Sequence, residues 1–393
     1  MFSVNPKPSS KLFIFPNGLA STWRWPRMLF PAALLPMLAA CSQPTPVTKA
    51  EAEAFANQLV SSMQQRDASL FNTMIDAETF ANIILDEMSI PFNKGFVEGI
   101  ETGLKNRKMG TELLHNMGDG GSIRLLRVYE KQGQQHVLLR TIFGETDGFN
   151  YYDLTLTHNR QNEVKVADMF IYLAGQWLST MMGELMAPAL GDDKNNANLS
   201  AIKSMQGIRP LLKKGKPREA LAIFEKLPAQ VRNQKISQII YLEICNQLED
   251  EDKYLQALEE FESLYPDATN AWLAGIDLAF LRKDYPKALQ LVDKLDQHVQ
   301  TDPYLNYYRG LLLNAYEKPN EAAMAYEKLI AEIDWLALGY LELMIIYAEQ
   351  GKKEQALQVH NKYVNAPCYN QEYLEGILEQ FPNLEQILKD KAK

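Results

Sequence analysis

Just after residue 50, hydrophobic residues are spaced as in an α-helix. Apolar residues recur every three or four positions from Ala52 to Met63, which predicts an amphipathic helix. A second helix is predicted over about 68–88. Pro91 predicts a break, and a third helix is expected to reach about His115.

The pattern then changes to that of β-strands. Four segments are rich in β-branched and aromatic residues and are bounded by turn residues. They are Ser122–Glu130, His136–Phe143, Phe149–His158 and Glu163–Leu173. Because the connections are short, we expect a curved four-stranded antiparallel sheet. A closing helix is expected from Gly175, so residues 50–190 predict an α+β domain.

A repeated phrase occupies the second half of the chain, after a polar, unpatterned stretch at 191–198 that predicts a linker. An alanine of this phrase opens the second helix of each predicted helix pair, where a small side chain permits close helix contact. The alanines are Ala220, Ala257, Ala288, Ala322 and Ala356, whose successive spacings are 37, 31, 34 and 34. Bulky residues follow each alanine by four positions, at Phe224, Phe261, Val292, Tyr326 and His360.

The phrase resembles the tetratricopeptide repeat, which has a similar period. The resemblance implies an all-α solenoid of about five repeats with a C-terminal cap over residues 199–393. The order of helices and strands before it resembles the cystatin-like, nuclear-transport-factor-like cone. The stretches Asn150–Asp153 and Val166–Tyr172, with Gly175 after them, resemble a bacterial envelope family of this kind that is joined to helical repeats and has no assigned chemistry.

An apolar, uncharged run lies at Met28–Ala40, with Arg24 and Arg27 before it. It is too short to cross a bilayer, which takes about 20 residues, and it suits a secretory signal. The run ends in Leu-Ala-Ala-Cys41, which resembles the bacterial lipobox. The resemblance implies a signal peptide at 1–40, diacylglycerol on Cys41 and a tether at 41–49. By the same analogy Ser42 favours the outer membrane, with the protein facing the periplasm.

Composition excludes some classes of protein. The net charge is −9 and the pI is about 5.3, so no basic footprint for nucleic acid is present. Three cysteines do not make a disulfide framework, although Cys245 and Cys368 remain a conceivable pair in an oxidising compartment.

The sequence signals little chemistry. It has no HExxH, CxxC, phosphate-loop or GxSxG motif, so we expect no metal, no cofactor and no enzymatic activity. Asp153 and Asp168 lie in neighbouring predicted strands and could form a paired acid/base site, but we favour capping, solvent or arginine partners for them. His136 and His158 could approach each other across strands as a weak metal site.

The aromatic residues of the predicted α+β domain allow a second kind of site. Such folds often enclose a cavity, so these residues either line a pocket for a small apolar ligand or fill the core. They are Tyr151, Tyr152, Phe170, Tyr172 and Trp177.

The predicted partner-binding residues lie on the first helix of each pair, which lines the concave face in the tetratricopeptide family. They are Leu242, Asn246, Leu273, Asp277, Phe280, Tyr304, Tyr307, Leu311, Asn314 and Leu341. Aromatic side chains beside Asn and Asp suit a protein or peptide partner. Leu242 and Leu273 stand where a clamp for a terminal carboxylate would need cations, which argues against that ligand.

The sequence therefore predicts a lipid-anchored adaptor of the cell envelope that binds a protein or peptide through its repeats. The alternative is a binder of a small hydrophobic molecule, held in the α+β domain and delivered to a partner through the repeats.

Overall fold

The computed structural model describes most of the chain after Pro44. The described residues are 45–118, 120–144, 148–190, 201, 204–205, 207–265 and 272–391. They belong to two compact units, an N-terminal unit that ends at Ala274 and a C-terminal unit that starts at Gly275. The predicted signal peptide, Cys41 and the 191–198 linker lie outside the described residues, and the predicted domain limits stay predictions.

The N-terminal unit begins with helices. These are α1 (Lys49–Gln64), α2 (Ser69–Thr73), α3 (Ala77–Glu87), α4 (Lys94–Asn106) and α5 (Met109–Met117). The first predicted helix is confirmed. Thr48 and Glu51 form a reciprocal capping box at the start of α1, and the apolar stripe from Ala52 to Met63 is buried.

The second predicted helix is divided into α2 and α3, because the residues between them pair with a strand. The Val166 amide donates to the Met74 carbonyl at 2.8 Å, and the Asp76 amide donates to the Val166 carbonyl at 2.9 Å. The Asp76 carboxylate then caps α3 by accepting from the Thr79 amide at 2.9 Å. The third predicted helix is likewise divided, at Arg107–Lys108, into α4 and α5.

The sheet is antiparallel, with the strands in sequence order. The strands are β1 (Ser122–Lys131), β2 (Gln134–Phe143), β3 (Gly148–His158), β4 (Val164–Ile171) and β5 (Gln176–Trp177). The four predicted strands are present. The fifth is a two-residue strand where the sequence predicted a helix, and the closing helix α6 (Leu178–Leu190) starts only after it.

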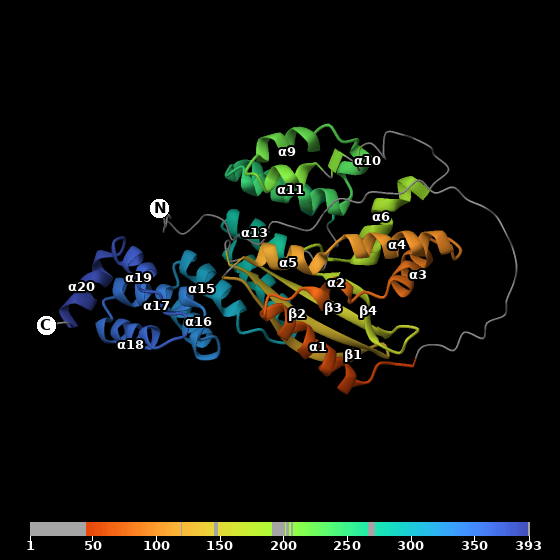
Figure 1. Cartoon of the computed structure of the whole chain (residues 1–393). Helices are drawn as coiled ribbons and strands as arrows, with labels where there is room; N and C mark the ends of the chain where they lie inside the picture. The colour runs from red at the N-terminus through yellow and green to blue at the C-terminus, as the bar shows by residue number, and fades with distance from the viewer. Residues whose placement is uncertain are drawn as a thin grey trace, which may run out of the picture. The chain divides into compact units, whose positions relative to one another are not determined.

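The two faces of the sheet have different surroundings. Helix α1 lies along β1 and β2 (Figure 1) and buries Phe55 and Leu59. Glu51 of this helix reaches His158, so the even-numbered residues of β3 face α1. Because side chains alternate along a strand, Asp153 and the other odd-numbered residues of β3 point to the opposite face.

Helices make up the rest of the described chain. The elements are α8 (Ile208–Leu212), α9 (Pro217–Phe224), α10 (Ala229–Arg232), α11 (Lys235–Gln247), α12 (Glu251–Leu264), α13 (Trp272–Leu281), α14 (Tyr285–Val299), α15 (Leu305–Ala315), α16 (Pro319–Glu332), α17 (Ala337–Glu349), α18 (Lys353–Val364), α19 (Gln371–Leu378) and α20 (Pro382–Lys391). Several consecutive helices pack on each other, among them α8 on α9, α11 on α12, and α14 through α18 in series. The helices from α14 onward belong to the C-terminal unit.

A left-handed backbone conformation recurs at a constant interval in the turns between paired helices. The residues with positive φ are Gly215 (66°), Glu249 (56°), Lys283 (58°), Glu317 (59°) and Gly351 (69°), and successive numbers differ by 34. In four of these turns the next amide donates to the carbonyl five positions earlier. These bonds are Lys216→Leu211, Asp284→Ala279, Lys318→Leu313 and Lys352→Tyr347, at 2.8–2.9 Å. This is the Schellman C-cap.

The regular turns correct the predicted alignment of the second repeat. Five positions after each left-handed residue come Ala220, Tyr254, Ala288, Ala322 and Ala356, all at most 1% exposed. The amide of each donates to the carbonyl four positions earlier. Tyr254 therefore takes the alanine position that the sequence analysis assigned to Ala257. The irregular spacings of 37 and 31 disappear, and Leu258 replaces Phe261 four positions further on.

Candidate functional site

The predicted partner-binding residues lie on or beside the first helices of the pairs. Helix α11 carries Leu242 and Asn246; α13 carries Leu273, Asp277 and Phe280; α15 carries Tyr307, Leu311 and Asn314, with Tyr304 at its N-cap; α17 carries Leu341. Leu242, Asn246 and Leu273 belong to the N-terminal unit and the others to the C-terminal unit.

These residues differ in exposure. Leu242, Leu273, Asp277, Tyr304 and Leu341 are at most 1% exposed, and Tyr307 and Asn246 are 7% and 9% exposed. Phe280 and Leu311 are half-buried, and Asn314 is exposed. The role of all of them stays a prediction, but the last three offer the most surface to a partner.

Phe280, one of these three residues, belongs to an aromatic cluster in the C-terminal unit. The ring centroids of Phe280 and Tyr285 are 6.0 Å apart, and those of Tyr285 and Tyr316 are 5.6 Å apart. The Lys318 ammonium lies 4.6 Å from the centroid of the Tyr316 ring, within the range of a cation–π contact. We call Phe280, Tyr285, Asn314, Tyr316 and Lys318 the aromatic edge.

The repeated turns position the aromatic edge. Lys283 and Glu317 take the left-handed conformation that reverses the chain after α13 and α15. The Asp284 carboxylate caps α14 by accepting from the Lys287 amide at 3.1 Å, which fixes Tyr285 in the first helical turn. Pro319 begins α16 directly after Lys318, at a position where its missing N–H costs nothing.

Tyr285 and Tyr316 are not among the predicted partner-binding residues, because both lie at turns and outside the predicted concave helical face. A signal was present, because the two turns are 34 positions apart and both combine aromatic and basic residues. Residues 280–287 and 314–318 contain four cations (Arg282, Lys283, Lys287 and Lys318) and two carboxylates (Asp284 and Glu317). Glu321, in the first turn of α16, pairs with Lys318 at 3.7 Å, so the local excess of positive charge is small.

A polar cluster occupies the sheet face opposite α1. The Tyr129 hydroxyl donates to Asp153 Oδ2 at 2.5 Å, and His136 Nδ1 lies 3.0 Å from Asp153 Oδ1. The Tyr129 and His136 rings stack at 5.1 Å, and the Arg127 guanidinium lies 4.1 Å from the Tyr129 centroid. Burial and the neighbouring Asp153 raise the pKa of Tyr129, so the hydroxyl stays protonated as a donor.

Asp168 has different partners. Its carboxylate accepts from the Ser179 hydroxyl at 2.6 Å and from the amides of Ser179 and Met169 at 3.1 and 2.8 Å. Burial raises the pKa of Asp168 to about 6 against these hydrogen bonds. Asp168 thus holds the start of α6, whereas Asp153 binds Tyr129 and His136. Each of the two carboxylates therefore has its own structural partners.

The two strand histidines project to opposite faces of the sheet. His136 is paired with Thr155, an odd-numbered residue of β3, whereas His158 lies on the face of α1. The idea that they approach each other is therefore wrong. In the part of the chain that the structure describes, no group of three or more His, Cys, Asp or Glu side chains could hold a metal ion. Cys245 and Cys368 are free thiols.

The aromatic residues of the α+β part pack on one another. Tyr151 contacts Phe149 and Tyr172 edge-on, at 5.4 and 5.5 Å between centroids, and Phe170 contacts Trp177 at 5.3 Å. Tyr151 and Tyr172 are at most 2% exposed. Rings in such contact fill a core.

Comparison with known proteins adds no assignment. No protein-family model matches the chain, and no curated protein matches it. Among the described residues, no helix has the length and apolar character needed to span a bilayer.

Proposed function

We propose that this chain is a lipid-anchored adaptor of the bacterial cell envelope, held at the outer membrane and facing the periplasm. It binds a protein or peptide partner through a tetratricopeptide-type helical array and catalyses no reaction. Cys41 carries the lipid. The aromatic edge supplies the first contact with the partner.

The sequence around Cys41 supports the anchor. An uncharged apolar run, small residues, a cysteine and a polar stretch follow one another in the order of a lipobox. Each buried methylene of an acyl chain contributes about 0.8 kcal/mol, so that several chains hold a protein firmly on a membrane.

The constant interval between the turns supports the repeat array. The left-handed residues recur at a spacing of 34, which is the period of the tetratricopeptide repeat. A stack of such pairs presents a long surface on which a partner segment can lie.

The aromatic edge is the single observation that carries the partner-binding proposal. Tyr316 is 37% exposed although its ring contacts Tyr285, and Lys318 lies over it. Tyrosine is among the residues that most often carry the binding energy of an interface. Four cations at the two turns outnumber Asp284, Glu317 and the Glu321 that pairs with Lys318, so the edge favours a segment that presents an apolar side chain beside acidic residues.

The alternative, a small hydrophobic ligand inside the α+β part, has less support. The rings that would line its pocket are in contact with one another and are buried.

Site-specific photo-cross-linking tests the adaptor. A photo-reactive amino acid replaces Tyr316 in the intact lipoprotein in cells, and captured proteins are identified by mass spectrometry. Tyr369 gives a matched control, because it is also in the C-terminal unit and is 38% exposed. We expect an envelope protein to be captured from position 316 and not from position 369.

Binding by the captured segment completes the test. A synthetic peptide of that segment should bind the purified protein, and Lys318→Glu should weaken binding. Lys328→Glu, an exposed charge reversal on α16, should leave binding unchanged. Equal capture from both tyrosines, or equal loss with both charge reversals, would remove the aromatic edge as the binding site.

A further inference from the structure

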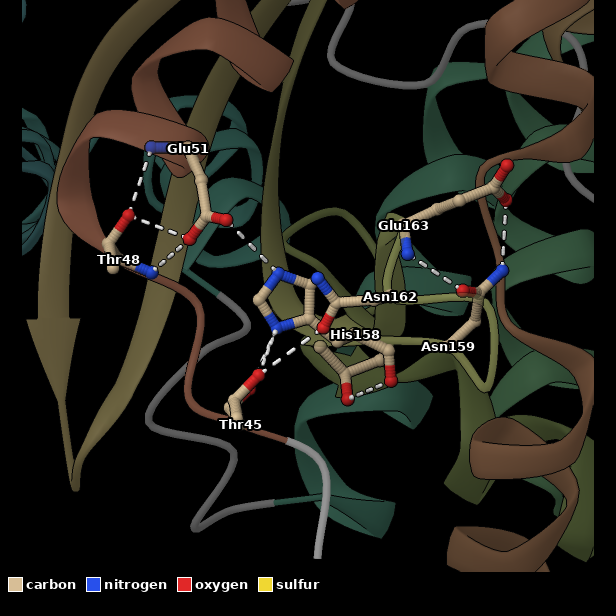
Figure 2. A network of polar contacts seen from close by, with 8 residues as sticks. Thr45, Thr48, Glu51, His158, Asn159, Asn162 and Glu163 are labelled. Atoms are coloured by element: carbon tan, nitrogen blue, oxygen red, sulfur yellow. Dashed lines mark hydrogen bonds and ion pairs between the residues drawn. The ribbon is translucent and has the colours of Figure 1, made fainter.

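The chain just after the predicted lipid attachment site is bound to the sheet through His158. His158 Nδ1 lies 2.7 Å from the Thr45 carbonyl oxygen and 3.3 Å from the Thr45 hydroxyl. Its Nε2 lies 3.4 Å from Glu51 Oε1, and the Thr45 hydroxyl also contacts Asn162 at 3.4 Å. Figure 2 shows this group, which we call the N-terminal latch: Thr45, Thr48, Glu51, His158 and Asn162.

The latch is built on rigid parts of the N-terminal unit. His158 ends β3 and is 4% exposed, so its ring has little freedom. Glu51 is held by Thr48, whose amide and hydroxyl both donate to its Oε2, at 2.8 and 2.7 Å. Val47, between the two threonines, is 7% exposed. The chain is therefore fixed to the sheet from Thr45 onward, inside the stretch that the sequence analysis took for a tether.

The turn between β3 and β4 is ordered at the same place. The Asn159 side chain accepts from the Glu163 amide at 2.8 Å (Figure 2). It also accepts from the Gln161 amide at 3.0 Å. The turn is polar, and Arg160, Gln161 and Asn162 are exposed. The Arg160 guanidinium pairs with Glu78 of α3, but its remaining N–H groups and the amides of Gln161 and Asn162 can donate hydrogen bonds to phosphate oxygens, so that the turn suits the headgroup layer of a membrane and not its interior.

The length of the intervening chain limits the distance to the lipid. Four peptide steps separate Cys41 from Thr45, and an extended chain of that length spans at most about 14 Å. Without the latch the free segment would reach to Lys49, eight steps, and about 29 Å. The latch halves the reach.

We propose that the N-terminal latch holds the β3–β4 turn against the phospholipid headgroups of the membrane that carries the Cys41 lipid. This inference rests on the proposed lipid anchor. In this orientation helix α1, which starts at the latch and extends for about 24 Å over its 16 residues, leads away from the membrane and keeps Gln65, at its far end, clear of the headgroups.

Quenching by labelled lipid tests the orientation. The full-length, acylated protein is reconstituted into phosphatidylethanolamine/phosphatidylglycerol vesicles that contain a headgroup nitroxide lipid. A fluorophore is placed at Gln161→Cys or at Gln65→Cys, two exposed glutamines, with Cys368→Ser to remove the partly exposed thiol. We expect quenching at position 161 and background quenching at position 65.

Two changes separate the latch from the lipid itself. A flexible insert of about 20 Gly and Ser residues between Ser42 and Gln43 adds roughly 25 Å of reach and should abolish the quenching at position 161. His158→Ala should reduce it, whereas His115→Ala, at an exposed histidine, should not. If His158→Ala fails to fold in a thermal unfolding measurement, the insert decides, because it leaves the latch intact.

The outcomes distinguish this inference from the proposed anchor. The mass of the mature N-terminal peptide reports the acyl groups on Cys41, and their absence would overturn both proposals. Acylated, vesicle-bound protein with equal quenching at positions 161 and 65, or with quenching that survives the insert, would overturn the orientation alone.

Discussion

Replacing Asp168 with asparagine should change how the stability of the protein depends on pH. Asp168 is 6% exposed, and burial raises its pKa from 3.8 to about 6, despite hydrogen bonds from Ser179 and Met169. Between these two pH values the folded state binds more protons than the unfolded state does. Stability therefore falls as pH rises from about 4 to about 6.

The size of the effect follows from the shift in pKa. A shift of about 2 units, at 1.36 kcal/mol per unit, corresponds to about 3 kcal/mol between pH 4 and pH 7. Asparagine has no titrating proton, so this part of the pH dependence should be lost in Asp168→Asn. Relative to the wild type, the variant should gain up to about 3 kcal/mol as pH rises over this range.

Urea unfolding of the unacylated chain at a series of pH values measures this difference. Any effect of the new amide on the Ser179 hydrogen bonds does not depend on pH. The test is therefore how the stability difference between variant and wild type changes with pH, and not its value at one pH. A flat difference between the two proteins from pH 4 to pH 7 would refute the reasoning, and so would a fall.

Asp67 provides a matched control. It also accepts hydrogen bonds from a serine, Ser69, but it is fully exposed, and these bonds lower its pKa. Its contribution to stability is present above the unfolded pKa and is lost as pH falls. The difference between Asp67→Asn and the wild type should therefore stay flat from pH 5 to pH 7, where that for Asp168→Asn still rises.

Three further substitutions test the packing. Gly310→Ala should destabilise the folded protein by about 1–3 kcal/mol in thermal or urea unfolding, because the added Cβ would lie 2.5 Å from the Tyr326 ring. Adding Tyr326→Leu should partly restore the stability. An unchanged stability of Gly310→Ala would show that the two helices separate easily. Tyr254→Ala should cost about 3–5 kcal/mol although alanine holds the equivalent position in the other pairs, and a neutral result would contradict the alignment. Tyr129→Phe should lower the stability by about 1–3 kcal/mol in the same unfolding measurement, because it leaves an Asp153 oxygen without its hydrogen-bond donor. An unchanged unfolding midpoint would show that water replaces the hydroxyl.

Local patterns predicted the elements that local forces determine. Helix α1 has its apolar stripe and its cap within one short stretch of sequence, and four strands were found from alternation and turn residues. The division between α2 and α3 could not be found in this way, because the hydrogen bonds that cause it come from Val166, on a strand far along the chain. Strand β5 has two residues and no pattern of its own, since its pairing with Phe170 and Ile171 defines it.

The difference between local patterns and long-range contacts also explains which site residues could be predicted from the sequence. Counting alanines placed Ala257 in the second repeat, because composition does not show which residue follows a left-handed turn by five positions. Tyr285 and Tyr316 lie at two different turns of the chain, and only the folded turns bring their rings to 5.6 Å. For Asp153, the prediction of a structural role was favoured, but its partners Tyr129 and His136 lie on two other strands.

The equally spaced turns have a consequence for how the length of this protein can change. The backbone at Glu317 has the same handedness and nearly the same φ as at Gly351, 59° and 69°, and the residue after each donates to the carbonyl five positions back. Excising residues 318–351 would connect Glu317 directly to Lys352, and the turn between α15 and α18 would then have the same geometry as the turns it replaces. Duplicating the same stretch would lengthen the array by one hairpin. Such joints let a gene gain or lose a whole unit in one recombination event without redesigning the bends that remain.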